Sequence, residues 1–338
     1  MVRIAWRSVA KGVGSFVLPS LRSTHQPNGT VTAEHCYGLC MRHYSHLARW
    51  LPPGGAPKVL LELGPGSSLG TGLAAILLGV EQYIALDVQD HRNTEHDIEV
   101  LRELVGLFAA RTVVRDGTDG EIVFPLPLTK IPGDDLDPVL ARTLEPAFIE
   151  QLVDDLRKDR GERLRFVAPW WNTEKIAPSS VDWLMTHSVM EHVDDLESTY
   201  ASFAKWVRPG GYMTHLIDFD AHTLASPWNG HWAIGDLTWK MMRGRRPYLL
   251  NRKWRSVHLE LLRANGFDVV DEMCHEPTGG LTPRALAPPF RQMSEEDAKV
   301  RMTFIVARRR MEDDRRRPQN VDLVTEKVEL TELGGALS

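Results

Sequence analysis

Cysteine is scarce in this chain. Its 338 residues include three cysteines, Cys36, Cys40 and Cys274. Three thiols cannot build the disulfide framework of a small secreted domain, and they cannot form a four-cysteine metal site. The composition therefore favours a reducing compartment, and we expect a cytoplasmic protein.

Long apolar runs and an excess of positive charge are also missing. The run from Leu73 to Val80 has eight residues, whereas a helix needs about 20 to cross the hydrocarbon core of a membrane. Lys and Arg total 40 against 45 Asp and Glu, and the net charge is −5. Charge alone therefore excludes a nucleic-acid binder. Hydrophobic residues make up 43%, which is enough for a buried core and excludes wholesale disorder.

Acidic residues are absent before Glu34. The opening stretch instead carries Arg3, Arg7, Lys11 and Arg22 among apolar residues. Such a segment is amphipathic. It can pack on its own domain, act as a targeting peptide, or lie on an anionic membrane through residues 1–22. We expect a basic arm and helix over 1–55, a main domain over 56–308 and a charged tail over 309–338.

The middle of the chain alternates between predicted strands and helices. The strands are expected at 58–63, 82–88, 163–168, 181–187, 212–217, 267–273 and 301–307, and the helices at 34–51, 69–78, 98–110, 196–207 and 254–265. This alternation predicts an α/β fold with a mainly parallel, doubly wound sheet. Two insertions, 111–162 and 218–251, interrupt it, and we expect them to form a lid.

A glycine turn follows the first predicted strand. The sequence LELGPGSSLG contains Gly64 and Gly66, and Asp87 ends the next strand 21 positions beyond Gly66. Glycines let the backbone approach a ligand, and an acid at this position can accept both ribose hydroxyls. A dinucleotide turn needs a third glycine where this chain has Leu69, which argues against a nicotinamide dehydrogenase. Glu62, just before the turn, suits a cationic ligand better than a phosphate.

Four segments in order, ELGPGSSLG, YIALDV, VDWLMTHSVMEHVDDL and FAKWVRPGGYMTHLI, resemble the motifs of class I S-adenosylmethionine-dependent methyltransferases. The resemblance covers roughly 56–218. It implies a Rossmann-like seven-stranded sheet and S-adenosylmethionine as the cofactor, with S-adenosylhomocysteine as the product. The third strand lacks the acid that the family usually places beside the adenine, so Ala168, Pro169 and Trp170 are expected to form the adenine wall. The implied cofactor contacts are Glu62, Leu63, Gly64, Pro65, Gly66, Asp87, Val88, Ala168, Pro169, Trp170, His187 and Ser188.

An aliphatic hydroxyl must lose its proton before it can accept a methyl group, so a base is needed within hydrogen-bond reach. The fifth predicted strand ends with His215, Asp218 and His222. We expect His215 to be the base, with Asp218 orienting it, at the mouth of the site. Glu191 with His192 is a second candidate pair. Two histidines and a carboxylate can also bind a divalent cation, but the spacing fits no metal motif, so no metal ligand is assigned.

The acceptor is less well defined by sequence. Six tryptophans near the predicted pocket suit a sugar ring, an aromatic ligand or an ordinary core: residues 170, 171, 228, 232, 239 and 254. The basic run 240–255 can bind an acidic substrate or a membrane, or can simply be solvated. HLIDFDAH and NRKWRSVHLELLRANGF resemble segments of methyltransferases of bacterial surface-polysaccharide synthesis. We therefore expect O-methylation of a sugar or glycan hydroxyl. The alternatives are a methyltransferase for a secondary metabolite and a non-catalytic, partner-binding protein with this fold.

Overall fold

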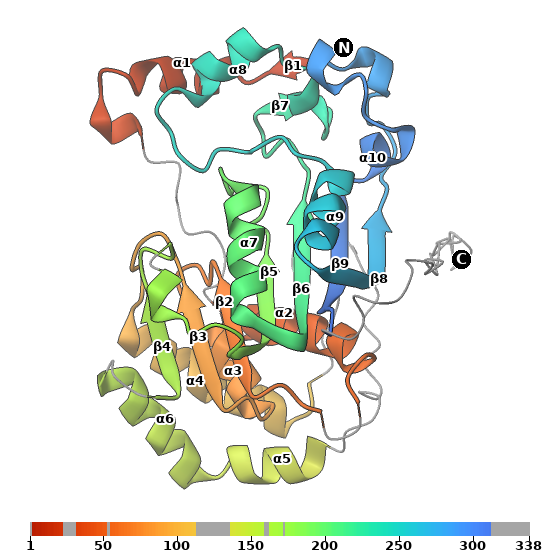
Figure 1. Ribbon diagram of the computed structural model, residues 1–338. Coiled ribbons are helices and arrows are strands. Elements are labelled where there is room, and N and C mark those ends of the chain that lie inside the picture. The colour runs from red at the N-terminus through yellow and green to blue at the C-terminus, as the bar shows by residue number, and fades with distance from the viewer. Residues whose placement is uncertain are drawn as a thin grey trace, which may run out of the picture.

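The computed structural model describes residues 2–22, 32–52, 55–112, 136–158, 162–171 and 173–311. Its centre is a seven-stranded sheet with the order β4-β3-β2-β5-β6-β9-β8 (Figure 1). The strands are β2 (Val59–Leu63), β3 (Gln82–Leu86), β4 (Leu164–Val167), β5 (Val181–His187), β6 (Val207–Asp218), β8 (Phe267–His275) and β9 (Met302–Arg309). Neighbours from β4 to β6 are parallel, and β9 is antiparallel to both β6 and β8. The predicted fold class is therefore confirmed.

Helices cover both faces of the sheet. One layer contains α2 (Ala33–Ala48), α3 (Gly70–Leu77) and α4 (Thr94–Ala109), and the other contains α7 (Leu196–Trp206) and α9 (Arg255–Ala264). Successive residues of a strand point to opposite faces. Leu60 of β2 accordingly packs in the core beneath α2 and α3, whereas Leu61 packs in the core beneath α7 and α9. Both faces are apolar, as expected for a buried parallel sheet.

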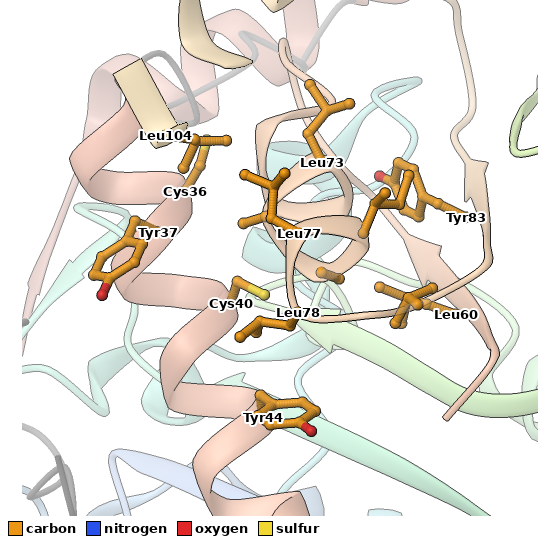
Figure 2. Packing of buried hydrophobic residues seen from close by; sticks show 14 of the residues in the cluster. Cys36, Tyr37, Cys40, Tyr44, Leu60, Leu73, Leu77, Leu78, Tyr83 and Leu104 are labelled. Carbon is orange, nitrogen blue, oxygen red and sulfur yellow. The ribbon is translucent and has the colours of Figure 1, made fainter. Parts of the chain in front are cut away.

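Two of the three cysteines are part of the core between α2 and α3. Figure 2 shows Cys36 of α2 beside Leu104 of α4, and Cys40 of α2 beside Leu78 at the end of α3. Burial raises the pKa of the Cys36 thiol to about 12, so the thiol stays protonated and packs as a small apolar group. The helices lie close because α3 begins with Gly70, where an added Cβ would collide with the Cys36 sulfur.

The second insertion and the N-terminal arm form one unit. The arm contains β1 (Arg3–Ile4) and α1 (Trp6–Gly14), and the insertion contains β7 (Ala225–Ser226) and α8 (Asp236–Arg243). β1 pairs antiparallel with β7, α1 packs against α8, and the unit lies beyond the edge where the parallel strands end (Figure 1). The arm therefore packs on its own chain, one of the alternatives for 1–22.

The described part of the first insertion lies elsewhere. It forms α5 (Leu136–Thr143) and α6 (Pro146–Lys158), at the opposite end of the sheet from α8 (Figure 1). The Thr143 hydroxyl donates to the carbonyl of Leu77 at the C-terminal end of α3. The lid expected from 111–162 is therefore not formed by 136–158, while 113–135 lies outside the described residues.

The remaining elements are short. They are α10 (Glu295–Lys299) and the 3-10 helices η1 (Pro19–Leu21), η2 (Thr173–Lys175), η3 (Gly230–Ala233), η4 (Pro283–Ala285) and η5 (Pro288–Phe290). No helix in the described part of the chain is both long and apolar enough to cross a membrane. Most of the predicted tail, from residue 312 onward, lies outside the described residues. The division at 55 and 308 stays a prediction.

Candidate functional site

The predicted cofactor residues meet at one edge of the sheet. β2, β3, β4 and β5 are neighbours and end in register, since Leu63 pairs with Leu86 and Thr186, and Leu86 pairs with Val167. Gly64, Asp87, Ala168 and Ser188 each follow the end of one of these strands. We call residues 62–66, 87–88, 168–170 and 187–188 the cofactor edge. Ligands of open α/β sheets bind at this kind of edge, outside the carboxyl ends of the strands.

The turn after β2 needs its glycines. Gly64 has a φ of +80° and Gly66 a φ of +78°, values that side chains other than hydrogen rarely allow. The Gly64 N–H donates to the Leu86 carbonyl at 2.8 Å. A Cβ on Gly64 would also collide with Val189 in the loop after β5. The turn is therefore held closely between the end of β3 and the loop after β5.

Glu62 lies beneath this turn. It is buried, and its carboxylate accepts a hydrogen bond from the Tyr83 hydroxyl at 2.5 Å. Burial raises the pKa of Glu62 to about 7; the Tyr83 hydrogen bond opposes this rise and the charge of Asp87 adds to it. A carboxyl group in this state gains most from a nearby cation, which would favour its ionised form.

Asp87 directly follows β3 at the cofactor edge. Its Oδ1 accepts the N–H of Val88 at 2.6 Å, and its side chain is 4% exposed. Tyr248 of the insertion has its pKa raised by burial and by the charges of Asp194 and Asp87. The insertion 218–251 packs against the loop after β5, since the Tyr248 carbonyl lies 3.1 Å from Nδ1 of His192 and the Asn251 side-chain amide donates to the Met190 carbonyl. We call this insertion the lid.

The predicted adenine wall follows β4 directly. The Ala168–Pro169 peptide bond is cis, and Trp170 is half-buried with its ring 6.3 Å from that of Trp171. Trp171 is 52% exposed. The two indole rings are nearly perpendicular, with an interplanar angle of 74°, so a single ring face, and not the pair, would pack on an adenine beside the strand end.

His187, at the end of β5, is held by a histidine that sequence analysis missed. Its Nδ1 lies 3.1 Å from Nε2 of His43 in α2, and Nδ1 of His43 lies 2.8 Å from the Thr214 hydroxyl. Burial lowers the pKa of His187 to about 3 and that of His43 well below its usual value. Both rings are therefore neutral at pH 7. A single histidine in an amphipathic helix carries no sequence signal for such a role.

His215 does not lie at the mouth of the site, so its predicted placement is wrong. It is fully buried in β6, its Nδ1 lies 2.8 Å from the Thr186 hydroxyl, and its ring stacks on Phe203 of α7. Burial lowers its pKa to about 3. Alternation along β6 explains the error, because residues 213, 215 and 217 face the core beneath α7 and α9. A buried ring in this position does not meet an acceptor.

The other predicted catalytic residues do lie together. Nε2 of His222 is 3.2 Å from Oδ2 of Asp218, at the end of β6. Glu191 and His192 come from the loop after the neighbouring strand β5. Ligand atoms of Glu191, His192 and His222 all lie within 4.8 Å of one another. We call Glu191, His192, Asp218 and His222 the edge cluster. It joins Asp218 and His222, two of the three predicted catalytic residues, to the second candidate pair, and it does not include His215.

The pKa values of two groups in the edge cluster, Glu191 and His222, are raised above their usual values. Burial, with the charge of Asp218, raises the pKa of Glu191 to about 8, while His222 opposes that rise. Burial lowers the pKa of His222, but its hydrogen bond to Asp218 and the charges of Glu191 and Asp218 outweigh burial and raise it. The cluster is therefore a buried set of acids beside a histidine that favours positive charge, a pattern typical of functional sites.

The loop carrying His222 has an unusual backbone. His222 and Thr223 have φ values of +46° and +63°, which cost about 1–3 kcal/mol each for residues of this kind. Asp218 and Asp220 hold the loop: Asp218 accepts the N–H of Asp220 at 2.8 Å, and Asp220 accepts the N–H of His222 at 2.7 Å. Arg301 pairs with Asp220 at 3.1 Å. Backbone strain fixed by a local network concentrates at functional sites.

Solved structures of methyltransferases are similar to this chain. A putative S-adenosylmethionine-dependent methyltransferase from Listeria monocytogenes is 14% identical, covering 80% of this chain and 98% of its own, with a TM-score of 0.37. An S-adenosylmethionine-dependent methyltransferase from Mesorhizobium loti is 14% identical, with coverage of 79% and 98% and a TM-score of 0.40. A Haloferax volcanii complex of the Trm112 methyltransferase activator with a putative methyltransferase is 13% identical, with coverage of 83% and 95% and a TM-score of 0.39. No family model and no curated protein matches. Similarity at this level does not establish a family.

Much of the basic run 240–255 is engaged within the protein. Arg243 pairs with Asp194, Arg255 pairs with Glu272, and Arg246 donates to Ser8 and Met242. The guanidinium of Arg252 lies over the rings of Trp239 and Phe290. Arg246 therefore joins the insertion to the arm, and the other three arginines are engaged by acidic or aromatic side chains of the same chain instead of forming a patch for an acidic substrate. Trp232 and Trp239 are likewise buried in the core.

Asn251 is a further residue that sequence analysis missed. Its side-chain amide donates to the carbonyls of Met190 and Val193, and its own N–H donates to the carbonyl of Glu191. His192 Nδ1 lies 3.1 Å from the Tyr248 carbonyl. The lid thereby fixes the loop that carries Glu191 and His192. Nothing in the sequence signals these pairings, since they join positions roughly 60 residues apart.

Proposed function

We propose that this chain is an S-adenosylmethionine-dependent O-methyltransferase whose acceptor is a hydroxyl of a sugar or glycan. One observation carries the proposal: the cofactor edge and the edge cluster lie at the ends of adjacent strands, β2 to β4 beside β5 and β6. A methyl donor bound at the first would present its methyl group toward the second. Methyl transfer needs such alignment of donor and acceptor.

The cofactor edge fits the donor group by group. Asp87 would accept the ribose hydroxyls, and the Ala168–Trp170 wall would pack on the adenine. Glu62 would be ionised by the positively charged methionine end of the cofactor. Gly64 and Gly66, which have no side chains, would let the cofactor approach the backbone, and His187 and Ser188 would contact its methionine portion.

The chemical step assigns a role to the edge cluster. A bond forms between the acceptor oxygen and the methyl carbon while the carbon–sulfur bond breaks. The bonding electrons stay on sulfur, which gives neutral S-adenosylhomocysteine. The hydroxyl proton must leave, and an unassisted aliphatic hydroxyl holds it too tightly. Asp218 and His222, two of the three predicted catalytic residues, belong to the group of side chains that we expect to remove it.

Calorimetric titration of the full chain separates the cofactor alternatives. We expect S-adenosylmethionine and S-adenosylhomocysteine to bind and NAD not to bind. Binding of NAD alone would contradict the proposal. Methyl transfer from labelled S-adenosylmethionine to hydroxylated sugars, compared with aromatic secondary metabolites, then tests the acceptor class. Donor binding without transfer to any hydroxylated acceptor would favour the partner-binding alternative.

We further propose that the protein is cytoplasmic and contacts an anionic membrane through the arm. The outer face of the arm supports this, since Trp6, Val13, Phe16, Val17 and Leu18 are all exposed. Exposed Arg3, Arg7 and Lys11 lie in the same segment, so apolar and cationic groups are combined as membrane-surface helices require. Removing the arm would uncover α8, so point substitutions are the better test.

The membrane proposal is tested by sedimentation of the protein with lipid vesicles at low salt. The protein should sediment with vesicles containing an anionic phospholipid and not with neutral ones. The double variant Phe16→Ser, Val17→Ser should lose most of this binding. Trp50→Ser, which alters an exposed aromatic outside the arm, is the matched control. If wild-type protein stays in the supernatant with anionic vesicles, the membrane proposal is wrong.

A further inference from the structure

The edge cluster contains a set of groups that acid–base chemistry alone does not explain. Glu191, His192 and His222 converge from two loops, with one ligand atom of each within 4.8 Å of the others. The His192 and His222 rings lie 5.1 Å apart. A cation with bonds of about 2.1 Å holds its ligand atoms roughly 3–4 Å apart. Small side-chain rotations would therefore bring the three groups into coordination distance.

Glu191 supplies a second, independent observation. It is 3% exposed, and neither oxygen of its carboxyl group has a hydrogen-bond partner among the described residues. A buried carboxyl group that lacks partners costs free energy. Asn251 hydrogen-bonds to the backbone around Glu191 and not to its side chain, and a carboxylate oxygen of Glu191 lies within 4.8 Å of a ring nitrogen of each histidine. A bound cation would satisfy both oxygens.

The two histidines are oriented as metal ligands usually are. Nδ1 of His192 lies at hydrogen-bond distance from the Tyr248 carbonyl, and Nε2 of His222 lies at hydrogen-bond distance from the Asp218 carboxylate. A carbonyl or carboxylate accepts the ring N–H and leaves the other nitrogen with its lone pair. Metal-binding histidines have such partners, which fix the tautomer and the ring orientation.

We propose that Glu191, His192 and His222 bind one divalent transition-metal cation, with Asp218 and Tyr248 as the supporting partners. Two imidazole nitrogens and one carboxylate favour Zn²⁺, Co²⁺ or a similar ion over Mg²⁺ or Ca²⁺, which prefer oxygen ligands. Three protein ligands leave coordination positions for substrate. His192 and His222 are only partly buried, so an acceptor can reach the site.

The chemical role of this cation rests on the proposed function. An acceptor hydroxyl bound to the cation would lose its proton to a water molecule, because a metal-bound oxygen is more acidic. The resulting alkoxide oxygen would form the bond to the methyl carbon, and the electron pair of the carbon–sulfur bond would stay on sulfur. His222 would then act as a ligand instead of accepting the proton itself.

Metal binding is measured directly, without the methyl-transfer reaction. Tag-free full-length protein is treated with a chelator, dialysed and titrated with Co²⁺ and with Zn²⁺ by calorimetry. Co²⁺ also reports its geometry through its visible absorption. We expect one Co²⁺ or Zn²⁺ per chain and no comparable binding of Mg²⁺. Asp218→Asn should weaken binding by about 10–100-fold, and Glu191→Gln and His222→Asn should weaken it more.

The variants are chosen so that folding is preserved. Glutamine has the shape of glutamate, and asparagine tolerates the positive φ of His222. His96→Gln alters a histidine that faces Glu99 on the surface of α4 and should leave binding unchanged. Absence of Co²⁺ and Zn²⁺ binding in wild type would overturn the proposal, as would equal binding in folded Glu191→Gln and His222→Asn. If the metal binds and no methyl transfer is found, the proposed function fails and the metal site stands.

Discussion

Gly64 and Val189 are in such close contact that any side chain on Gly64 would overlap the Val189 methyl groups. This contact joins the turn after β2 to the loop after β5, the two segments that we expect to enclose the methionine end of the cofactor. A side chain at position 64 is disfavoured for two reasons, the collision with Val189 and the positive φ of Gly64.

Gly64→Ala should therefore destabilise the protein by about 1–3 kcal/mol and weaken cofactor binding. The double variant Gly64→Ala, Val189→Ala should recover only part of this, because it removes the collision and keeps the backbone strain. Unfolding in denaturant and calorimetry measure the two effects. Gly106→Ala is the control: Gly106 lies in α4 with open space around it, so alanine should stabilise by about 0.5–1 kcal/mol.

Asp87→Ala should weaken S-adenosylhomocysteine binding by roughly 2–3 kcal/mol, or about 30- to 150-fold, since two charge-assisted hydrogen bonds to the ribose would be lost. Calorimetric titration gives the affinity directly. Asp90→Ala removes a nearby exposed acid that pairs with Arg92 and should change affinity little. Equal affinity of Asp87→Ala and wild type would refute the ribose assignment.

Cofactor affinity should depend on pH through Glu62. Its raised pKa of about 7 means that the free protein holds a proton there below pH 7. A cationic ligand favours the ionised form, so binding releases this proton. S-adenosylmethionine affinity should accordingly rise by up to about tenfold per pH unit from pH 5 to 7. Calorimetric titrations in buffers with different ionisation enthalpies measure the number of protons that are released on binding.

The variant Glu62→Gln tests whether Glu62 causes this pH dependence of cofactor affinity. Glutamine cannot ionise, so the rise in affinity between pH 5 and 7 and the proton release should both disappear. If the variant retains the wild-type slope, another group is responsible.

Substitutions of the two histidines should separate core packing from chemistry. His222→Asn should lower turnover on the order of 10²–10⁴-fold, because deprotonation of the acceptor depends on this side chain and usually contributes a factor of that size; cofactor affinity should be nearly unchanged. His215→Leu should instead lower stability by about 1–3 kcal/mol, because the Thr186 hydroxyl loses its buried partner. Its folded fraction should keep most of its turnover.

Steady-state kinetics and denaturant unfolding of the same preparations distinguish these outcomes. A fall in turnover for His215→Leu as large as that for His222→Asn, at unchanged stability, would restore His215 as the base.

The sheet, and the set of residues that meet at the ends of its parallel strands, could be predicted from sequence because their signals are local. A strand, a glycine turn and an acid at the next strand end are each read within a few residues, and parallel neighbours bring their carboxyl ends together without further information. The core strands were located to within a few residues, apart from β6, which starts at Val207 instead of 212. The amphipathic character of the arm was also predicted from its pattern of basic and apolar residues.

The membership of the edge cluster depends on long-range packing and could not be predicted from the sequence. His215 and His222 look equivalent along the chain, but the alternation of β6 buries the first against Phe203 and the loop beyond it turns the second back onto Asp218. Glu191 lies beside His222 because its loop is held by Asn251, about 60 residues away in the sequence. Such contacts depend on side chains packed from distant segments, and no local periodicity encodes which distant partner a polar residue finds.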